Sequence, residues 1–376
     1  MRAMEMGLMA YLVLIFWFFG FIFFWKVHYP KSIRRLDETS SSISIIIPAR
    51  NEERNLTRLV QSIKDQNLKA HEIIVIDDHS KDLTAEMGRM AGCMVIPSKD
   101  LPEGWTGKPW ACWQGAQKAT GDIFLFLDAD TFLEPEGLSK IVSTYLEKGG
   151  LLSVQPFHKM KRMYERLSAI FNLITVGGMN AFTPFGPRLK PTGAFGPCMI
   201  CSRKDYFKVG GHEKARGEVL ESLTIGKEFL RANRKVNCYG GKGTISFRMY
   251  PDGFQSLVEG FGKGFGTGAN AMSMVGLFMI AGWVFGGVSV TRHVVQPAIM
   301  GNRIASVGWL VLYVLYLFQL HWMLRRIGNF GFLTALLFPI PLIFFVFVFA
   351  YSIVRIFFVR RVRWKGRDVK TTKGKD

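Results

Sequence analysis

The sequence has few cysteines for its length, and their spacing excludes two common roles. Five cysteines in 376 residues provide no disulfide framework. Cys198 and Cys201 form one C-x-x-C pair, but no second pair of ligands is spaced to complete a structural zinc site. We therefore interpret the cysteines as packing thiols of a reducing compartment.

Acidic residues are also scarce, with 29 Asp and Glu against 48 Lys and Arg and a net charge of +19. A charge of this size is compatible with nucleic-acid binding, but no nucleic-acid-binding motif accompanies it. The basic residues instead gather beside apolar stretches, at Lys26, Lys31, Arg34, Arg35, Arg355, Arg360, Arg361, Arg363, Lys365 and Arg367. This distribution predicts contact with an anionic membrane surface and no nucleic-acid partner.

Long apolar runs lie at both ends of the chain. Residues 7–25 are long enough to cross a bilayer and lack a small-residue cleavage site, which predicts an uncleaved anchor. The basic residues after this run place the next domain in the cytoplasm. Further apolar runs cover 274–290, 304–324 and 332–354. If all three crossed, the basic tail would lie outside. We expect a cytoplasmic tail, so either the proline-broken last run turns back or the glycine-rich first run lies along the membrane.

Between the apolar ends, short buried strands alternate with amphipathic helices. Strands are expected at 44–47, 72–76, 93–96, 124–127 and 151–157, and helices from about 51, 83 and 109 and over 159–176 and 217–231. Pro48 is expected to end the first strand, and Asn51 to cap the first helix. The rhythm predicts an α/β fold with a mostly parallel sheet and helices on both faces.

These patterns also predict the domain boundaries. They are an anchor over 1–27, a linker over 28–41, an α/β domain over 42–253, an interfacial amphipathic segment over 254–273, membrane segments over 274–358 and a basic cytoplasmic tail over 359–376.

Polar residues follow three of the expected strands. Asp128 and Asp130 come directly after a buried strand, Asp77 and Asp78 end another, and the first ends in the run Pro48-Ala49-Arg50-Asn51-Glu52. The carboxyl ends of parallel strands open into a ligand crevice. Two carboxylates there suit a hard divalent cation whose other ligands are phosphate oxygens and water. The alternative is a solvated loop with two chance aspartates.

The same residues resemble motifs of the family 2 inverting glycosyltransferases of the GT-A fold. The resemblance rests on the run Ile45 to Glu53, the Asp77-Asp78-x-Ser80 turn and Asp128-Ala129-Asp130, in matching order over residues 42–260. It implies a Rossmann-like GT-A domain, a nucleotide-sugar donor that we expect to be UDP-glucose, and Mg²⁺ or Mn²⁺.

The resemblance also implies roles for individual residues. Pro48, Ala49, Arg50 and Glu52 would surround the nucleotide, Asp77 and Asp78 would lie near its base and ribose, and Asp128, Ala129 and Asp130 would face the sugar and the diphosphate, with both aspartates as metal ligands. Lys108 would add a cation near the phosphates, or is a solvated loop lysine. Arg248 would assist the diphosphate or an acidic acceptor, or forms a structural salt bridge. His212 is expected to take no part in the chemistry.

An inverting transfer needs one general base on the acceptor side of the sugar. The family usually places an acidic pair at a helix start, where this chain has Leu220-Glu221, with Glu218 one turn earlier. We expect Glu221 and Asp128 to be the catalytic residues, with Glu218 as the alternative base. If the acceptor is a carboxylic acid, it is already ionised, and Glu221 would position the acceptor rather than remove a proton from it. The remaining alternative is that Glu221 is a surface helix residue.

Within the family, the chain most resembles the enzymes that glycosylate the C30 carotenoid carboxylate 4,4'-diaponeurosporenoate in staphyloxanthin-type pigment synthesis. The segments that carry this resemblance are Leu151 to Pro156, Ala169 to Leu173, Ala194 to Pro197, Phe247 to Tyr250, Gly253 to Leu257 and Trp364 to Arg367. The resemblance implies a lipophilic acceptor drawn from the membrane and a multi-pass cell-membrane enzyme with a cytoplasmic catalytic domain.

The segment Gln255 to Phe261 lacks the Arg and Trp of the Q-x-x-R-W motif of processive synthases, which favours a single transfer. The alternatives are another acceptor (a sterol, hopanoid, polyprenyl phosphate or diacylglycerol) and a non-catalytic membrane scaffold.

Overall fold

The computed structural model describes residues 2–32, 42–186, 189–218, 220–269, 272–294, 296, 303–354, 361–364 and 367–370. The chain divides into two compact units. The α/β unit comprises His28–His158, Pro191–Met249 and Val359–Asp376, and the helical unit comprises Met1–Val27, Lys159–Lys190 and Tyr250–Phe358. The structure thus groups 159–190 with the apolar helices, whereas the expected α/β domain over 42–253 included it.

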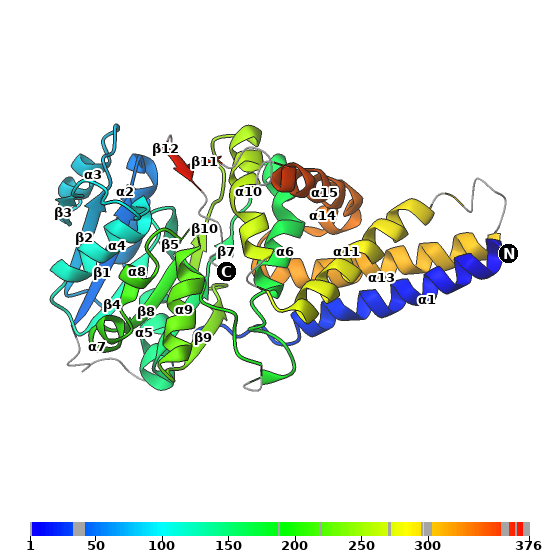
Figure 1. Ribbon diagram of the computed structural model, residues 1–376, viewed down its shortest axis with the longest axis horizontal. Helices are drawn as coiled ribbons and strands as arrows, with labels where there is room; N and C mark the ends of the chain where they lie inside the picture. The colour runs from blue at the N-terminus through cyan, green and yellow to red at the C-terminus, as the bar shows by residue number, and fades with distance from the viewer. Residues whose placement is uncertain are drawn as a thin grey trace. The chain divides into compact units, whose positions relative to one another are not determined.

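The α/β unit alternates strands and helices along most of its length (Figure 1). Its elements are β1 (Ile43–Ala49), α2 (Glu53–Lys64), β2 (Glu72–Asp77), α3 (Thr84–Met90), β3 (Met94–Pro97), α4 (Gly107–Lys118), β4 (Ile123–Leu127), β5 (Thr131–Leu133), α5 (Gly137–Lys148), β6 (Leu151–Gln155), β7 (Phe157–His158), β8 (Cys198–Ser202), α7 (Arg203–Lys208), α8 (Gly211–Lys214), α9 (Glu221–Arg231), β9 (Val236–Gly240), β10 (Ile245–Phe247), β11 (Arg361–Trp364) and β12 (Arg367–Lys370).

The main sheet has seven strands in the order β3-β2-β1-β4-β8-β6-β9. Strands β1 to β4 are mutually parallel where they pair, β6 and β9 are parallel, and β8 runs antiparallel to β4 and β6. A smaller sheet has the order β5-β10-β7. The prediction of a mostly parallel sheet within an α/β fold is confirmed.

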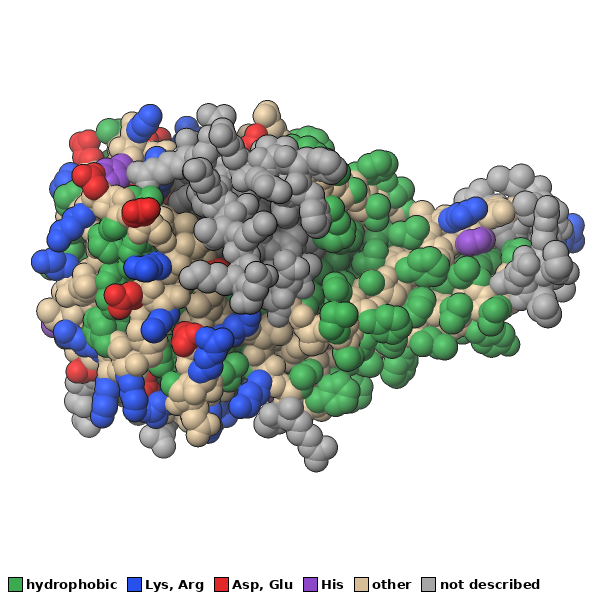
Figure 2. Space-filling model, in the orientation of Figure 1, with side chains coloured by type: hydrophobic (Ala, Val, Ile, Leu, Met, Phe, Trp, Pro, Cys, Tyr) green, Lys and Arg blue, Asp and Glu red, His purple; other side chains and the backbone are tan. Residues whose placement is uncertain are grey.

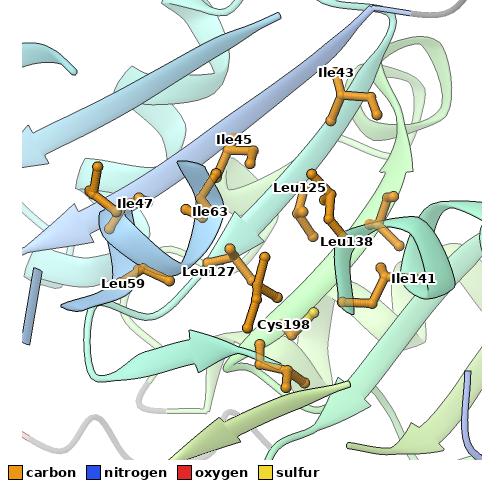
Figure 3. Close-up of a cluster of buried hydrophobic side chains, with 14 of the residues drawn as sticks. Ile43, Ile45, Ile47, Leu59, Ile63, Leu125, Leu127, Leu138, Ile141 and Cys198 are labelled. Atoms are coloured by element: carbon orange, nitrogen blue, oxygen red, sulfur yellow. The ribbon is translucent and has the colours of Figure 1, made fainter. Parts of the chain in front are cut away.

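The core of this unit forms on both faces of the central strands. On one face, Ile45 and Ile47 of β1 belong to a buried cluster with residues of α2 and α5, such as Ile63 and Leu138 (Figure 3). On the other face, Ile46 meets α4 at Gly115, where an added Cβ would lie 2.5 Å from Cγ2 of Ile46. Glycine at this position lets the helix backbone approach the sheet closely.

Two local predictions at the end of β1 are wrong. Pro48 lies inside β1 rather than after it, since β1 still pairs with β2 there, whereas its pairing with β4 has ended at Ile46. Asn51 does not cap α2: Glu52 is the N-cap residue, and Asn51 has a left-handed φ of 53°. The side-chain oxygen of Asn51 instead accepts a hydrogen bond from the amide of Lys81 at 2.8 Å, which ties two loops together.

The helical unit is built mainly from long apolar helices. Its elements are α1 (Arg2–Phe23), a 3₁₀ turn η1 (Met163–Ser168), α6 (Ala169–Gly177), α10 (Phe254–Ala269), α11 (Met274–His293), α13 (Arg303–Ile327), α14 (Phe332–Leu336) and α15 (Pro339–Val354). In the described part of the chain, three helices (α1, α11 and α13) are long and apolar enough to cross a membrane. Figure 2 shows hydrophobic side chains along this unit. The exposed hydrophobic residues of the unit include Leu8, Phe18, Phe278 and Phe318.

Two expected elements of this unit are altered by the structure. The predicted helix over 159–176 begins only at Met163, as a 3₁₀ turn that continues into α6. The apolar run over 332–354 breaks at Leu337 and Phe338 into α14 and α15. Pro339 explains the break, because proline lacks the amide that a helix needs and disfavours helical geometry in the residue before it.

A buried amide joins three of the helices in this unit. The side-chain oxygen of Gln319 in α13 accepts the indole N–H of Trp283 in α11 at 2.9 Å, and its nitrogen donates to the carbonyl of Trp17 in α1 at 2.7 Å. The indole of Trp17 in turn donates to the carbonyl of Leu315 at 3.1 Å. Polar groups within apolar helices need such partners, because a lipid environment provides none.

Candidate active site

The loops after β1 and β2 meet at one edge of the main sheet. The guanidinium of Arg50 donates to the carbonyl of Asp78 at 2.9 Å and lies 3.5 Å from that residue's carboxylate. The amide of Asp78 donates to the carbonyl of Ala49 at 2.8 Å. Five of the residues predicted to bind the nucleotide therefore lie together, because Pro48 pairs with Ile76 and Ala49 pairs with Asp77 in the parallel ladder.

Further hydrogen bonds fix the loop that carries Glu52. Its amide donates to the hydroxyl of Thr84 at 2.8 Å, and the amide of Asn51 donates to the hydroxyl of Ser80 at 3.0 Å. The side chains after β2 thus satisfy the backbone of the loop after β1. The two loops, which follow neighbouring strands, are therefore held in one arrangement.

The D-x-D segment forms a tight turn between β4 and β5. The amide of Asp128 donates to the carbonyl of Pro197 at 3.0 Å. The carbonyl of Asp128 accepts from the amide and the hydroxyl of Thr131 at 3.1 and 2.7 Å. Ala129 is buried, while Asp128 and Asp130 are both partly exposed. The turn therefore presents two carboxylates at the carboxyl end of β4.

This donor set fits a hard divalent cation that brings other ligands with it. Carboxylate oxygens are the ligands that Mg²⁺ and Mn²⁺ accept, and Mg²⁺ commonly takes one or two of them together with phosphate oxygens and water. No group of three or more His, Cys, Asp or Glu side chains is arranged to hold a metal within the described ranges. Asp128 and Asp130 are thus suited to a metal that arrives with a phosphate-bearing ligand.

Lys108 lies between two carboxylates from distant parts of the sequence. Its Nζ is 2.8 Å from Oδ1 of Asp128 and 2.8 Å from Oε1 of Glu221. A second oxygen of Asp128 lies 3.1 Å away. The side chain of Glu221 is 9% exposed, whereas those of Lys108 and Asp128 are 22% and 26% exposed. We call these three residues the lysine–carboxylate cluster.

Two helix starts and one loop build this cluster. Lys108 is the second residue of α4, and Glu221 is the first residue of α9. Gly196 lies against both: an added Cβ there would be 3.5 Å from Nζ of Lys108 and 3.5 Å from Oε1 of Glu221. The neighbouring Pro197 accepts the amide of Asp128. The loop before β8 therefore contacts every member of the cluster.

The charges of Lys108 and Glu221 are stabilised within the cluster, whereas burial raises the pKa of Asp128 above its ordinary value although Lys108 opposes this effect. Burial disfavours the charge on Lys108, but Asp128 and Glu221 outweigh it and hold the pKa of the ammonium well above its ordinary value. Burial likewise tends to raise the pKa of Glu221, but Lys108 outweighs this effect and the pKa is lowered. Glu221 is thus a carboxylate with its own counter-ion.

The structure decides several alternatives that the sequence left open. Glu221 is not a surface glutamate, and Lys108 is not a solvated loop lysine, because both lie in the cluster. Glu218 is not helical, since α9 begins three residues later, and its side chain is exposed. Its carbonyl accepts the hydroxyl of Thr106 at 3.3 Å, just before α4.

Two other residues from the sequence take defined positions. Arg248 follows directly after β10, whose last residue Phe247 pairs with Thr131, the first residue of β5. His212 is buried, and its Nδ1 lies 2.8 Å from the hydroxyl of Tyr206. Burial lowers the pKa of His212 to about 3, so the ring is neutral at physiological pH.

Sequence reasoning missed two features of the site. Nothing in the local pattern linked Lys108 to Glu221, because the two residues belong to separate helix starts far apart in the chain. The sequence placed Gly196 only within the segment Ala194 to Pro197 and gave it no contact with the site. The one available signal was a lysine directly before a helix predicted from about residue 109, because a cation at a helix start is unfavourable unless it has an anionic partner.

Comparison with known proteins gives a consistent result. Residues 44–207 match the family described as Glycosyl transferase family 2. The chain is 36% identical over 359 residues to the 4,4'-diaponeurosporenoate glycosyltransferase of Staphylococcus aureus strain MRSA252. The alignment covers 94% of this chain and 95% of that protein. The protein of the same name from strain USA300 matches with the same identity and coverage.

A solved structure shares the fold over nearly the whole chain. It is a mannosyltransferase from Pyrobaculum calidifontis in complex with GDP-Man and Mn²⁺, with a TM-score of 0.56 and 14% sequence identity. The match covers 95% of this chain and 98% of that one. At this identity the likeness concerns the fold alone.

Proposed function

Because the chain belongs to glycosyl transferase family 2, we propose that this glycosyltransferase transfers glucose from UDP-glucose to the carboxylate of 4,4'-diaponeurosporenoate. The product is a glycosyl ester with inverted configuration at the anomeric carbon. The observation that carries the proposal is the lysine–carboxylate cluster at the carboxyl end of β4, beside the D-x-D turn. Membership of the family makes the chain an enzyme, which removes the scaffold alternative.

The acceptor is inferred from the relatives. The name of the staphylococcal proteins specifies a carotenoid carboxylate, and their similarity extends over the helical unit as well as the α/β unit. The apolar helices suit an acceptor that is dissolved in a membrane. The donor rests on the motif resemblance, with Arg50, Glu52, Asp77 and Asp78 around the nucleotide.

The residues at the sheet edge divide the work of the reaction. The paired loops after β1 and β2 hold the nucleotide, and the turn after β4 presents Asp128 and Asp130 to the diphosphate. Mg²⁺ or Mn²⁺ held there would neutralise the charge that builds on the departing UDP. An acceptor oxygen forms a bond to the anomeric carbon while that carbon's bond to the diphosphate oxygen breaks. The bonding electrons leave with UDP.

The order of the helices supports a membrane topology. With α1, α11 and α13 as the three crossings, the α/β unit and everything after α13 lie on the same side. The basic residues after α1 and in the tail then share the cytoplasmic side, as the positive-inside rule requires. The break at Leu337 and Phe338 leaves α15 with 16 residues, fewer than the roughly 20 that cross a bilayer, so we propose that this last run turns back. A green fluorescent protein fused to the C-terminus should fluoresce if the tail is cytoplasmic. Cells that contain the full-length fusion protein but show no fluorescence would contradict this topology.

The catalytic proposal is tested with the purified full chain in lipid nanodiscs. Labelled UDP-glucose is supplied with Mn²⁺ and one acceptor at a time: 4,4'-diaponeurosporenoate, a sterol, a hopanoid, a polyprenyl phosphate or diacylglycerol. We expect label only in the carotenoid acid, as an alkali-labile ester. Transfer only to a hydroxyl or phosphate lipid would replace the proposed acceptor while keeping the glycosyltransferase. Parallel reactions with UDP-galactose and GDP-mannose test the donor.

A further inference from the structure

The ion pair between Lys108 and Glu221 bears on the kind of acceptor that the enzyme uses. An inverting transfer to a hydroxyl group needs a general base with an oxygen available for the acceptor's proton. In this site Oε1 of Glu221 already accepts from Nζ of Lys108 at 2.8 Å, and the carboxylate is almost fully buried. Glu221 is therefore poorly placed to serve as a free base.

The groups around the pair reinforce this conclusion. Lys108 lowers the pKa of Glu221 despite its burial, and a lower pKa makes a weaker base. His212 is neutral because burial lowers its pKa to about 3. Burial raises the pKa of the Cys112 thiol, which stays protonated. Asp128 is the remaining charged neighbour, and it too is paired with Lys108.

Lys108 itself keeps capacity for a further anion. An ammonium group has three N–H donors; Glu221 takes one, and the two oxygens of Asp128, at 2.8 and 3.1 Å, can share a second as a bifurcated hydrogen bond. Its side chain is 22% exposed, so the residue is not sealed off from solvent. A substrate carboxylate that enters a site with three acidic side chains needs such a cation, because like charges repel strongly where water is excluded.

Resting on the proposed function, we propose that Lys108 binds the carboxylate of the acceptor and that Glu221 is a positioning residue that fixes the Lys108 ammonium. The cluster thereby selects an acceptor that arrives ionised over one that bears a hydroxyl group. A carboxylic acid has a pKa near 4, so at neutral pH its oxygen is already a nucleophile.

The chemical step balances without a base. One oxygen of the acceptor carboxylate forms the bond to the anomeric carbon, the bond from that carbon to the diphosphate breaks, and the electron pair leaves with UDP. No proton has to be removed. A hydroxyl acceptor would have to release its proton to a base during the same step.

The test compares two matched acceptors with the full chain in nanodiscs: 4,4'-diaponeurosporenoate and the primary alcohol made by reducing its carboxyl group. Glu221→Gln should retain transfer to the acid within about tenfold of wild type, whereas loss of a general base typically costs about 10²–10⁴-fold. The rate with the acid should also stay flat between pH 6 and 8 in both proteins. The alcohol should be a poor acceptor for wild type.

Lys108 is tested by separating acceptor from donor binding. Lys108→Met should raise the KM for the acid by more than tenfold while changing the Kd of UDP, measured by calorimetry with Mn²⁺, by less than threefold. Lys108→Arg retains a cation and should recover most of the acceptor affinity that Lys108→Met loses. This pair of variants keeps the test decisive if Glu221→Gln does not fold. Lys118→Met, an exposed lysine at the other end of α4, is the matched control and should behave as wild type.

Three results would overturn the inference: a loss of 10²-fold or more with Glu221→Gln and the acid acceptor, an effect of Lys108→Met on UDP binding alone, or efficient wild-type transfer to the alcohol. A wild-type enzyme that glucosylates neither acceptor but hydrolyses or transfers another nucleotide sugar would contradict the proposed function instead. The two failures are therefore distinguishable.

Discussion

Nζ of Lys108 lies 2.8 Å from Oδ1 of Asp128, so the protein itself supplies a cation to the first carboxylate of the D-x-D turn. A divalent ion that approaches this turn must share Asp128 with the ammonium. At 4 Å and an effective dielectric constant near 20, two unit charges interact by about 4 kcal/mol. The lysine thus opposes metal binding until a diphosphate adds negative charge.

This relationship predicts how the metal binds without a donor. Lys108→Met should bind Mn²⁺ more tightly than wild type in the absence of nucleotide, by tenfold or more, as measured by the free-ion signal in electron paramagnetic resonance. Unchanged Mn²⁺ affinity in Lys108→Met, with Lys118→Met as the reference, would show that the ammonium does not compete for Asp128.

The two ends of β4 provide a matched test of Asp130. Asp130→Asn should lower kcat/KM by about 10²–10³-fold, because it removes a proposed ligand of the metal ion that would neutralise charge on the departing diphosphate. Asp122→Asn is the control, since Asp122 precedes β4 at the opposite end and bonds to Ser42. Both variants should melt near the wild-type temperature. Full activity in Asp130→Asn would refute a role for this carboxylate.

Gly115 is expected to be essential for the contact between α4 and the sheet. Gly115→Ala gains about 1 kcal/mol of helix propensity but places a methyl group 2.5 Å from Cγ2 of the buried Ile46. Overpacking of this kind costs about 1–3 kcal/mol, and Ile46 has no room to move away. We expect a lower Tm by calorimetry. Gln117→Ala, an exposed change on the same helix, should leave the Tm within a degree or two.

Glu72 should contribute to stability in a defined range of pH. Burial tends to raise its pKa, but hydrogen bonds from Ser44 and Thr120 outweigh burial and lower it below the ordinary value of 4.5. A lowered pKa in the folded state stabilises the protein above the unfolded-state pKa, and the effect disappears as the pH falls through the folded-state value. Glu72→Gln should therefore be less stable than wild type at pH 7, and the difference should diminish below pH 4.5 in chemical denaturation.

The buried amide of the helical unit predicts a membrane-specific effect. Gln319→Leu removes the acceptor for the Trp283 indole and the donor to the Trp17 carbonyl. Hydrogen bonds between apolar helices contribute about 0.6 kcal/mol each on average. We expect a small, reproducible loss of thermal stability in nanodiscs. Val311→Leu, on the exposed side of α13, is the control and should have no effect.

The sheet edge was predictable because strand order and strand ends are local features of the sequence. Buried runs that end in Asp77 and Asp128 identify parallel strands, and parallel strands deliver their carboxyl ends to one edge. The pairing of Arg50 with Asp78 follows from neighbouring registers. The long apolar helices were equally visible, because length and apolar character are sufficient to identify candidate membrane spans.

The cluster was not predictable from the same reasoning. Lys108 and Glu221 meet because two helix starts converge on β4, and no periodic pattern encodes that convergence. The predicted Asn51 cap was wrong because its side chain bonds to the next loop, a tertiary contact that replaces the local one. A break at the prolines of the last apolar run was expected, but its exact place at Leu337 and Phe338 came only from the structure.

The hydrogen bonds of Trp17 and Gln319 also set an order of events during synthesis. The two residues are separated by about 300 positions, so at about 5–20 residues per second α1 exists for roughly 15–60 s before its partner in α13 has been translated. Throughout that interval the indole of Trp17 lacks the Leu315 carbonyl that receives it in the finished protein. Membrane insertion of α1 and formation of its hydrogen bonds with α13 are therefore expected to be separate steps. In a chain truncated before α13, α1 should still insert but should lack a fixed helix partner.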